Sequence, residues 1–149
     1  MVASPAPAPR IVLSVSHYTR VRTKLSDATL LVAALNELGY PTVEVHDQPG
    51  QLFGYQGDLR PERADVIVRR KHIGPASNDL GFARQEDGSF EAIISGFDAH
   101  RHDTQWLDRL TQAYGYAAAL RYARDHGYEV LTDTSEHDGT RRLTLRRVS

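Results

Sequence analysis

The second half of the chain repeats the pattern of the first, and this repetition restricts the fold more than any other feature of the sequence. A helix-period run ends in Leu38-Gly39-Tyr40, and the later of two following β-type runs closes on Val68-Arg69-Arg70. A second helix-period run ends in His126-Gly127-Tyr128, and the last β-type run closes on Leu145-Arg146-Arg147. Two helix–strand–strand units of like pattern indicate one domain built by internal duplication.

Alternating apolar residues predict a first strand ahead of the first helix. Ile11, Leu13, Val15 and Val21 all occupy odd positions. A period of two places them on one face of a sheet, toward the core. The even positions then form a polar outer face made of Tyr18, Arg20, Arg22 and Lys24.

Capping residues and glycines define two helices. Ser26 or Asp27 is expected to cap the first helix, which runs through Leu38 until Gly39 ends it. The residue just beyond a helix often adopts the left-handed conformation, which glycine tolerates best. Asp103 is expected to cap the second helix, which Gly127 ends in the same way.

Short apolar runs and turn residues predict the remaining strands. Residues 64–70 have the composition of a buried strand, and residues 80–84 and 90–94 flank a turn and predict a hairpin. A closing hairpin is expected to turn at Asp138-Gly139. The segment from Asp47 to Arg63 is expected to be a long, glycine-rich loop, and such loops inside small domains are often functional.

These elements predict an α+β fold. We expect a two-layer sandwich in which both helices cover one face of a mostly antiparallel sheet. Residues 11–149 would form this single domain, whose length suffices for a core without covalent staples. The Ala/Pro-rich residues 1–10 are expected to be a disordered leader.

Composition limits the chemistry that the chain can carry. It contains no cysteine, which excludes disulfides, thiolate metal sites and a cysteine nucleophile and favours the cytoplasm. No apolar run approaches the ~20 residues that cross a bilayer, so no membrane association is expected. The net charge of −1 provides no overall field that would attract nucleic acid.

Several short motifs resemble those of one protein family. They are Ser16-His17-Tyr18, Gly54-Tyr55-Gln56-Gly57, Val68-Arg69-Arg70, Leu110-Thr111-Gln112-Ala113-Tyr114-Gly115-Tyr116 and Gly127-Tyr128. From about Ser16 to its C-terminus, the chain resembles the "hypothetical chloroplast open reading frame thirty-five" family of cyanobacteria, algal plastids and other bacteria, a domain of unknown function. The resemblance implies a small cytoplasmic protein whose family accompanies ATPases of the AAA type, and it implies no activity or cofactor.

One cluster has metal-ligand chemistry. His100 and His102 lie between Asp98 and Asp103, and imidazoles with carboxylates suit zinc or manganese. The alternative is a polar linker in which Asp103 caps a helix. No third histidine stands at helical spacing nearby, so we expect no metal and no cofactor.

The glycine-rich segment offers a more plausible site. It lacks the Lys-Ser/Thr ending of a P-loop, so phosphate binding is poorly supported. Aromatic residues anchor protein interfaces, and we expect this segment to contact a partner, although its residues can instead fold back onto the core. The candidate partner-binding residues are Phe53, Gly54, Tyr55 and Gly57.

Two functional classes remain open. No serine lies in a nucleophile-elbow glycine pattern, so we expect a non-catalytic protein-interaction or adaptor module that works with a protein partner. The family resemblance implies an AAA-type ATPase as a candidate for that partner. The alternative is a nucleic-acid-binding domain, for which Glu44, Asp65 and Glu91 would partly neutralise the surface. The cations of that expected sheet face are Arg20, Arg22, Lys24, Arg69, Arg142 and Arg146.

Overall fold

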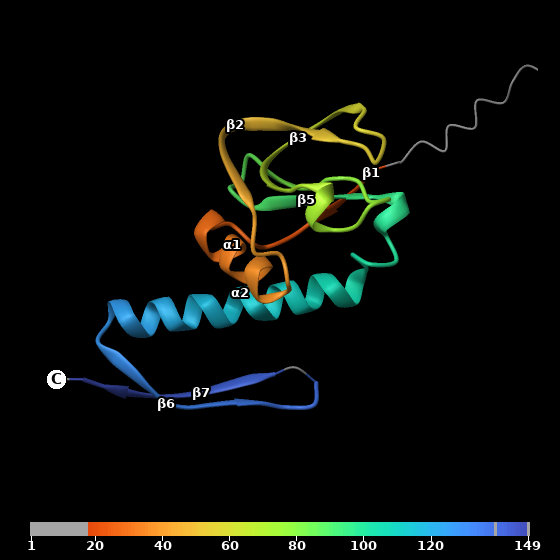
Figure 1. Cartoon of the computed structure of the whole chain (residues 1–149). Helices are drawn as coiled ribbons and strands as arrows, with labels where there is room; N and C mark the ends of the chain where they lie inside the picture. Colours follow the sequence, from red (N-terminus) through yellow and green to blue (C-terminus); the bar gives the residue numbers. More distant parts are fainter. Residues whose placement is uncertain (1–17, 139, 149) are drawn as a thin grey trace, which may run out of the picture.

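The computed structural model describes residues 18–138 and 140–148, so the predicted leader and the first residues of the predicted first strand, 11–17, lie outside it. Figure 1 shows the arrangement of the elements. In chain order they are β1 (Tyr18–Arg22), α1 (Ala28–Glu37), β2 (Glu44–Phe53), β3 (Leu59–Val68), η1 (Arg70–His72), β4 (Leu80–Arg84), β5 (Phe90–Ser95), η2 (Gly96–Asp98), α2 (Thr104–Asp125), β6 (Tyr128–Ser135) and β7 (Arg141–Arg147).

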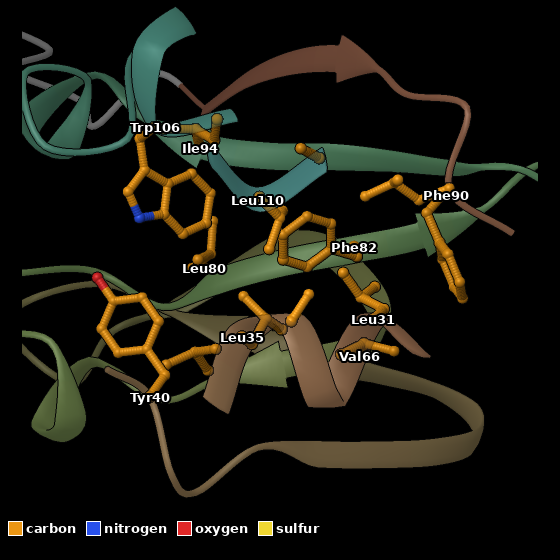
Figure 2. Packing of buried hydrophobic residues seen from close by; sticks show 14 residues of the cluster. Leu31, Leu35, Tyr40, Val66, Leu80, Phe82, Phe90, Ile94, Trp106 and Leu110 are labelled. Atoms are coloured by element: carbon orange, nitrogen blue, oxygen red, sulfur yellow. The ribbon is translucent and has the colours of Figure 1, made fainter. Parts of the chain in front are cut away.

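Five strands form one antiparallel sheet, and both helices cover one face of it. The strand order is β1-β5-β4-β3-β2, and every neighbouring pair is antiparallel. Leu31 and Leu35 of α1 and Leu110 of α2 pack in one buried cluster with side chains of the sheet (Figure 2). The predicted α+β class, with two helices on one side of a mostly antiparallel sheet, is confirmed.

The last two strands form a separate sheet, which corrects the duplication prediction. β6 and β7 pair only with each other, and they lie on the side of α2 away from the five-stranded sheet (Figure 1). Both halves do follow the order helix, strand, strand. The segments ending at Arg70 and Arg147 nevertheless occupy different environments, because β2 and β3 join the main sheet. The polar run Thr132-Asp133-Thr134 offers β6 no apolar face that a main-sheet strand would bury.

The helix ends agree with the capping prediction. The side chain of Asp27 accepts a hydrogen bond from the backbone of Leu30 at 3.0 Å, and that of Asp103 accepts one from Trp106 at 2.9 Å. Each such cap typically contributes about 1 kcal/mol. Gly39 and Gly127 have φ values of 101° and 72°, so both helices end at a residue that needs the left-handed region.

The predicted loop from Asp47 to Arg63 is wrong, because most of it belongs to the β2–β3 hairpin. Register shifts interrupt the pairing of β2 with β3 between Val45 and Gly50 and again between Gln51 and Phe53. Such irregularities bend a strand and hide the period-two pattern in the sequence. The bent half of the hairpin lies over the sheet face away from the helices, where Leu52 joins a second buried cluster.

Gly81 of β4 allows the bent half of the β2–β3 hairpin to lie close to the sheet. A Cβ atom added at Gly81 would lie 2.7 Å from the Cβ of Ala64, a distance that no real pair of side chains tolerates. The fold therefore brings the end of β2 next to β1, where the hydroxyl of Tyr18 is 3.5 Å from the carbonyl oxygen of Phe53. Tyr18 thus faces away from the helices, as its even position predicts.

Neither helix of the described residues has the length and apolar character of a membrane span.

Candidate partner-binding site

Three consecutive buried polar residues, Ser77, Asn78 and Asp79, lie next to the end of β2. Asp79 is 1% exposed. Its carboxylate accepts hydrogen bonds from the backbone of Phe53 at 2.8 Å and of Arg70 at 2.7 Å, and from the guanidinium of Arg69 at 2.8 Å. Since one side chain satisfies groups from two segments, Asp79 ties the end of β2 to the chain that follows β3.

Asn78 connects the turn after β2 to the region that follows β5. Its amide oxygen accepts a hydrogen bond from the backbone of Tyr55 at 2.8 Å, and its amide nitrogen donates to Ser95 at 3.1 Å. Its own backbone N–H donates to the carboxylate of Asp98 at 3.0 Å. These bonds hold the Tyr55 turn beside η2.

This network presents two aromatic rings to solvent. Tyr55 is 44% exposed and Phe97, in η2, is 55% exposed. Their rings are stacked, with centroids 6.4 Å apart and planes 14° from parallel. Large exposed aromatic groups that lie together are typical of interaction sites.

A surface pocket of about 720 Å³ lies beside the Tyr55 turn. The ring of Phe53 forms an apolar part of its wall, and the guanidinium of Arg69 lies over this ring at 5.5 Å from the centroid. The pocket therefore combines an aromatic surface with positive charge. Its lining residues are Phe53, Gly57, Arg69, Arg70, Lys71, Gly74, Pro75 and Asp79.

The guanidinium of Arg69 pairs with two neighbouring carboxylates and also donates to the carbonyl oxygen of Gln51 at 2.8 Å. It donates to Glu44 at 2.9 Å as well as to Asp79. Burial opposes the charged form of Arg69, but the two carboxylates outweigh it and raise the pKa of the guanidinium above its usual value. The same contact with Arg69 lowers the pKa of Glu44. Arg69 is therefore a structural cation of the pocket wall.

The predicted partner-binding residues meet at this place. Phe53 and Gly57 line the pocket, and Tyr55 lies between them on the exposed turn. Gly54 is buried, and a Cβ added there would lie 2.5 Å from the carboxylate of Asp58. The N–H groups of Gly54 and Gly57 donate to carbonyls within the turn, so they are not directed at an anion.

Sequence reasoning missed Phe97, Asn78, Asp79 and the two cations Arg70 and Lys71. The run Ser77-Asn78-Asp79 resembles an ordinary polar turn, and nothing in its composition indicates that all three residues are buried. Phe97 stands between Gly96 and Asp98, in a segment that has no apolar periodicity. Its position 42 residues after Tyr55 carries no periodic signal, and only the fold brings the two rings together.

The histidine pair does not converge. His100 is exposed, with its Nδ1 atom 3.1 Å from the carbonyl oxygen of Phe97. His102 is buried, with Nε2 2.7 Å from the hydroxyl of Tyr40. The centroid of its ring lies 4.5 Å from the centroid of the Trp106 ring. Across residues 18–138 and 140–148, no group of three or more potential ligand side chains is placed to hold a metal ion.

The six cations of the expected basic face do not share one sheet, so that grouping is wrong. Arg142 and Arg146 belong to β7 of the two-stranded sheet, where they pair with Glu136 and Glu129. In the five-stranded sheet, Arg20 lies 3.2 Å from Glu91. Arg69 is paired as described above, whereas Arg22 and Lys24 are exposed. Carboxylates therefore neutralise most of the set.

Comparison with known proteins identifies relatives but no assigned activity. The sequence model of a family described as "Protein of unknown function (DUF1257)" matches residues 34–144. The chain is similar to the "Uncharacterized protein ycf35" of Guillardia theta (26% identity) and of Pyropia yezoensis (23% identity), in each case over 89% of this chain and 97% of the relative. The corresponding protein of Cyanophora paradoxa is 26% identical over the same shares. These matches confirm the resemblance inferred from the motifs. No solved structure matches the chain.

Proposed function

Because the chain belongs to the DUF1257 family of proteins of unknown function, we propose its function from the site itself: it is a non-catalytic protein-interaction module. The proposed contact surface consists of Phe53, Tyr55 and Phe97, and we call it the aromatic surface. The stacked, exposed pair of Tyr55 and Phe97 beside the pocket carries this proposal.

The way in which the aromatic surface is held supports binding of a partner. Asn78 and Asp79 fix the backbone of Tyr55 and Phe53 through buried hydrogen bonds. A group that is ordered before binding loses little conformational entropy when a partner arrives. Aromatic side chains also bury a large area for few rotatable bonds, so a rigid exposed pair is suited to an interface.

An ATPase of the AAA type is one candidate partner. The support for it is the family resemblance, and the aromatic surface is compatible with any protein partner that offers an apolar contact. We propose that such an ATPase, if it is the partner, contacts Tyr55 and Phe97.

The nucleic-acid alternative has less support. Its cations are divided between two sheets, and Arg20, Arg69, Arg142 and Arg146 are each paired with a carboxylate. A nucleic-acid surface requires cations that follow the backbone continuously.

Affinity capture from the native host tests the protein-interaction proposal. The bait is the full chain, compared with the double variant Tyr55→Ala/Phe97→Ala and with Tyr122→Ala. Tyr122 is a matched control, because it is 54% exposed and stacks on His126 far from the pocket. We expect the double variant to weaken binding of the captured protein by about 2 kcal/mol or more, which is about thirtyfold. The control should bind like the unaltered chain.

The affinity of the purified captured protein for each bait, measured by calorimetry, gives the decisive comparison. Equal affinity for the unaltered chain and the double variant would contradict the proposal. Equal loss in both variants would also contradict it, since the effect would then not belong to the aromatic surface.

A further inference from the structure

Arg70 and Lys71 are two cations of the pocket whose charged groups, unlike that of Arg69, have no ion-pair partner among the described residues. Arg70 and Lys71 both line the pocket. The backbone N–H of Arg70 donates to Asp79, but in the described part of the chain neither its guanidinium nor the ammonium of Lys71 has an ion-pair or hydrogen-bond partner. Two adjacent positive charges in the lining of a pocket leave an excess of positive charge that an anionic ligand would balance.

The rest of the pocket is suited to an apolar group next to that anion. The ring of Phe53 and the ring of Pro75 line it, and the exposed rings of Tyr55 and Phe97 extend the apolar surface beyond it. A ligand that satisfies both parts therefore carries carboxylate and apolar groups close together. A peptide segment with acidic and hydrophobic side chains has this composition.

The charges around the pocket argue against a long polyanion. The carboxylates of Glu44 and Asp58 are next to lining residues, with side chains 39% and 43% exposed. A nucleic-acid backbone carries closely spaced charges along its whole length and would meet these carboxylates. One or two ligand carboxylates can reach Arg70 and Lys71 without doing so.

Resting on the proposed function, we propose that this site recognises an acidic segment of its protein partner. One or two carboxylates of the segment bind Arg70 and Lys71, and a neighbouring apolar side chain enters the pocket against Phe53. Tyr55 and Phe97 cover the adjoining part of the segment. The pocket thus supplies selectivity for charge, while the aromatic surface supplies apolar contact area.

The experiment uses a displayed library of random short peptides as its probe, with the full chain as bait. Selected peptides are retained for analysis only if their binding is lost with Tyr55→Ala/Phe97→Ala. We expect these peptides to be enriched in aspartate and glutamate beside aromatic or aliphatic residues. Their affinity should fall with rising salt, because charge-assisted contacts at an open site are screened.

Charge variants locate the contact. Arg70→Gln/Lys71→Gln should weaken the selected peptides about tenfold. Arg22→Gln/Lys24→Gln is the matched control, because it also removes one arginine and one lysine charge, from exposed side chains at and just after the end of β1 opposite Tyr18. It should leave the affinity unchanged. Glu44→Gln releases Arg69 from one of its two carboxylates and should strengthen binding about threefold.

The outcomes separate this inference from the proposed function. Selection of neutral peptides, equal effects of the two double charge variants, or unchanged or weaker binding after Glu44→Gln would overturn the acidic-ligand inference. A clear preference for phosphorylated peptides or for single-stranded RNA, offered in parallel, would overturn it as well. Capture of a partner that requires Tyr55 and Phe97 would still support the interaction module in each of these cases.

Discussion

Two consecutive short polar residues, Asn78 and Asp79, determine the shape of the candidate site, since their side chains accept hydrogen bonds from backbone groups of separate segments. Asn78 and Asp79 are 0% and 1% exposed, and burial of such groups is tolerable only when hydrogen bonds replace those to water. Their partners include the backbone of Tyr55 and Phe53. The apolar contact surface therefore depends on polar residues beneath it.

His102 is a buried residue whose charge state should control stability. It lies between Tyr40 and Trp106, and burial lowers its pKa from 6.5 to about 4, although Asp98 partly opposes this shift. In the unfolded chain the imidazole takes up a proton near pH 6.5, whereas in the folded protein it stays neutral down to about pH 4.

We predict that the free energy of unfolding decreases as the pH falls from about 6.5 to 4. The contribution of His102 is fully present above pH 6.5, and about 3 kcal/mol is lost across this window. Urea denaturation at a series of pH values measures this change in the free energy of unfolding. His102→Gln should flatten the dependence in this window, whereas the exposed control His100→Gln should not. A profile that His102→Gln leaves unchanged would refute the assignment.

At the level of elements, the length of α2 sets it apart from α1. α2 spans Thr104–Asp125, and two of its three fully buried residues, Trp106 and Leu110, lie in its first half. Its second half contacts the β6–β7 hairpin, where the hydroxyl of Tyr116 donates to Asp133 and Arg141 lies over the Tyr116 ring. Since most side chains of β6 are exposed, the hairpin is held by few buried contacts.

We predict that β6 and β7 open locally at a lower free energy than β4 and β5. Hydrogen exchange should show faster exchange of the amides in β6 and β7 under native conditions. Tyr116→Ala should accelerate exchange in the hairpin further while the amides of β5 remain protected. Equal protection of the two sheets would show that the hairpin is part of the same cooperative unit.

At the scale of the whole molecule, charges are numerous but mostly balanced. The chain has 18 basic and 19 acidic residues, with a net charge of −1. Ion pairs such as Arg20–Glu91 and Arg121–Asp27 distribute opposite charges over the surface. Such a surface produces no extended positive field.

We predict at most weak binding to single-stranded DNA or RNA, with dissociation constants of ~10⁻⁴–10⁻⁶ M that weaken as salt rises. Titrations at low and high salt, followed by fluorescence anisotropy, check this. Nanomolar binding that Arg20→Ala/Arg22→Ala abolishes would instead favour the nucleic-acid function and place it ahead of the interaction module.

The sequence by itself determined the local structure of this protein. Helix caps at Asp27 and Asp103, glycine stops at Gly39 and Gly127, and the order of helices and strands follow from interactions within a few residues, so local patterns were sufficient to predict them. Family membership also followed from short motifs. The candidate residues Phe53, Tyr55 and Gly57 could be selected because aromatic side chains in a glycine-rich segment are typical of protein interfaces.

Only the tertiary structure decided how these parts meet. The β2–β3 hairpin bends because of register shifts that leave no periodic signal. β6 and β7 pair only with each other, on the side of α2 away from the main sheet, although their order in the chain repeats that of β2 and β3. Phe97 reaches Tyr55, and Asp79 reaches Phe53, through contacts between residues far apart in the chain. Such contacts depend on the packing of every intervening element, and no local pattern in the sequence records them.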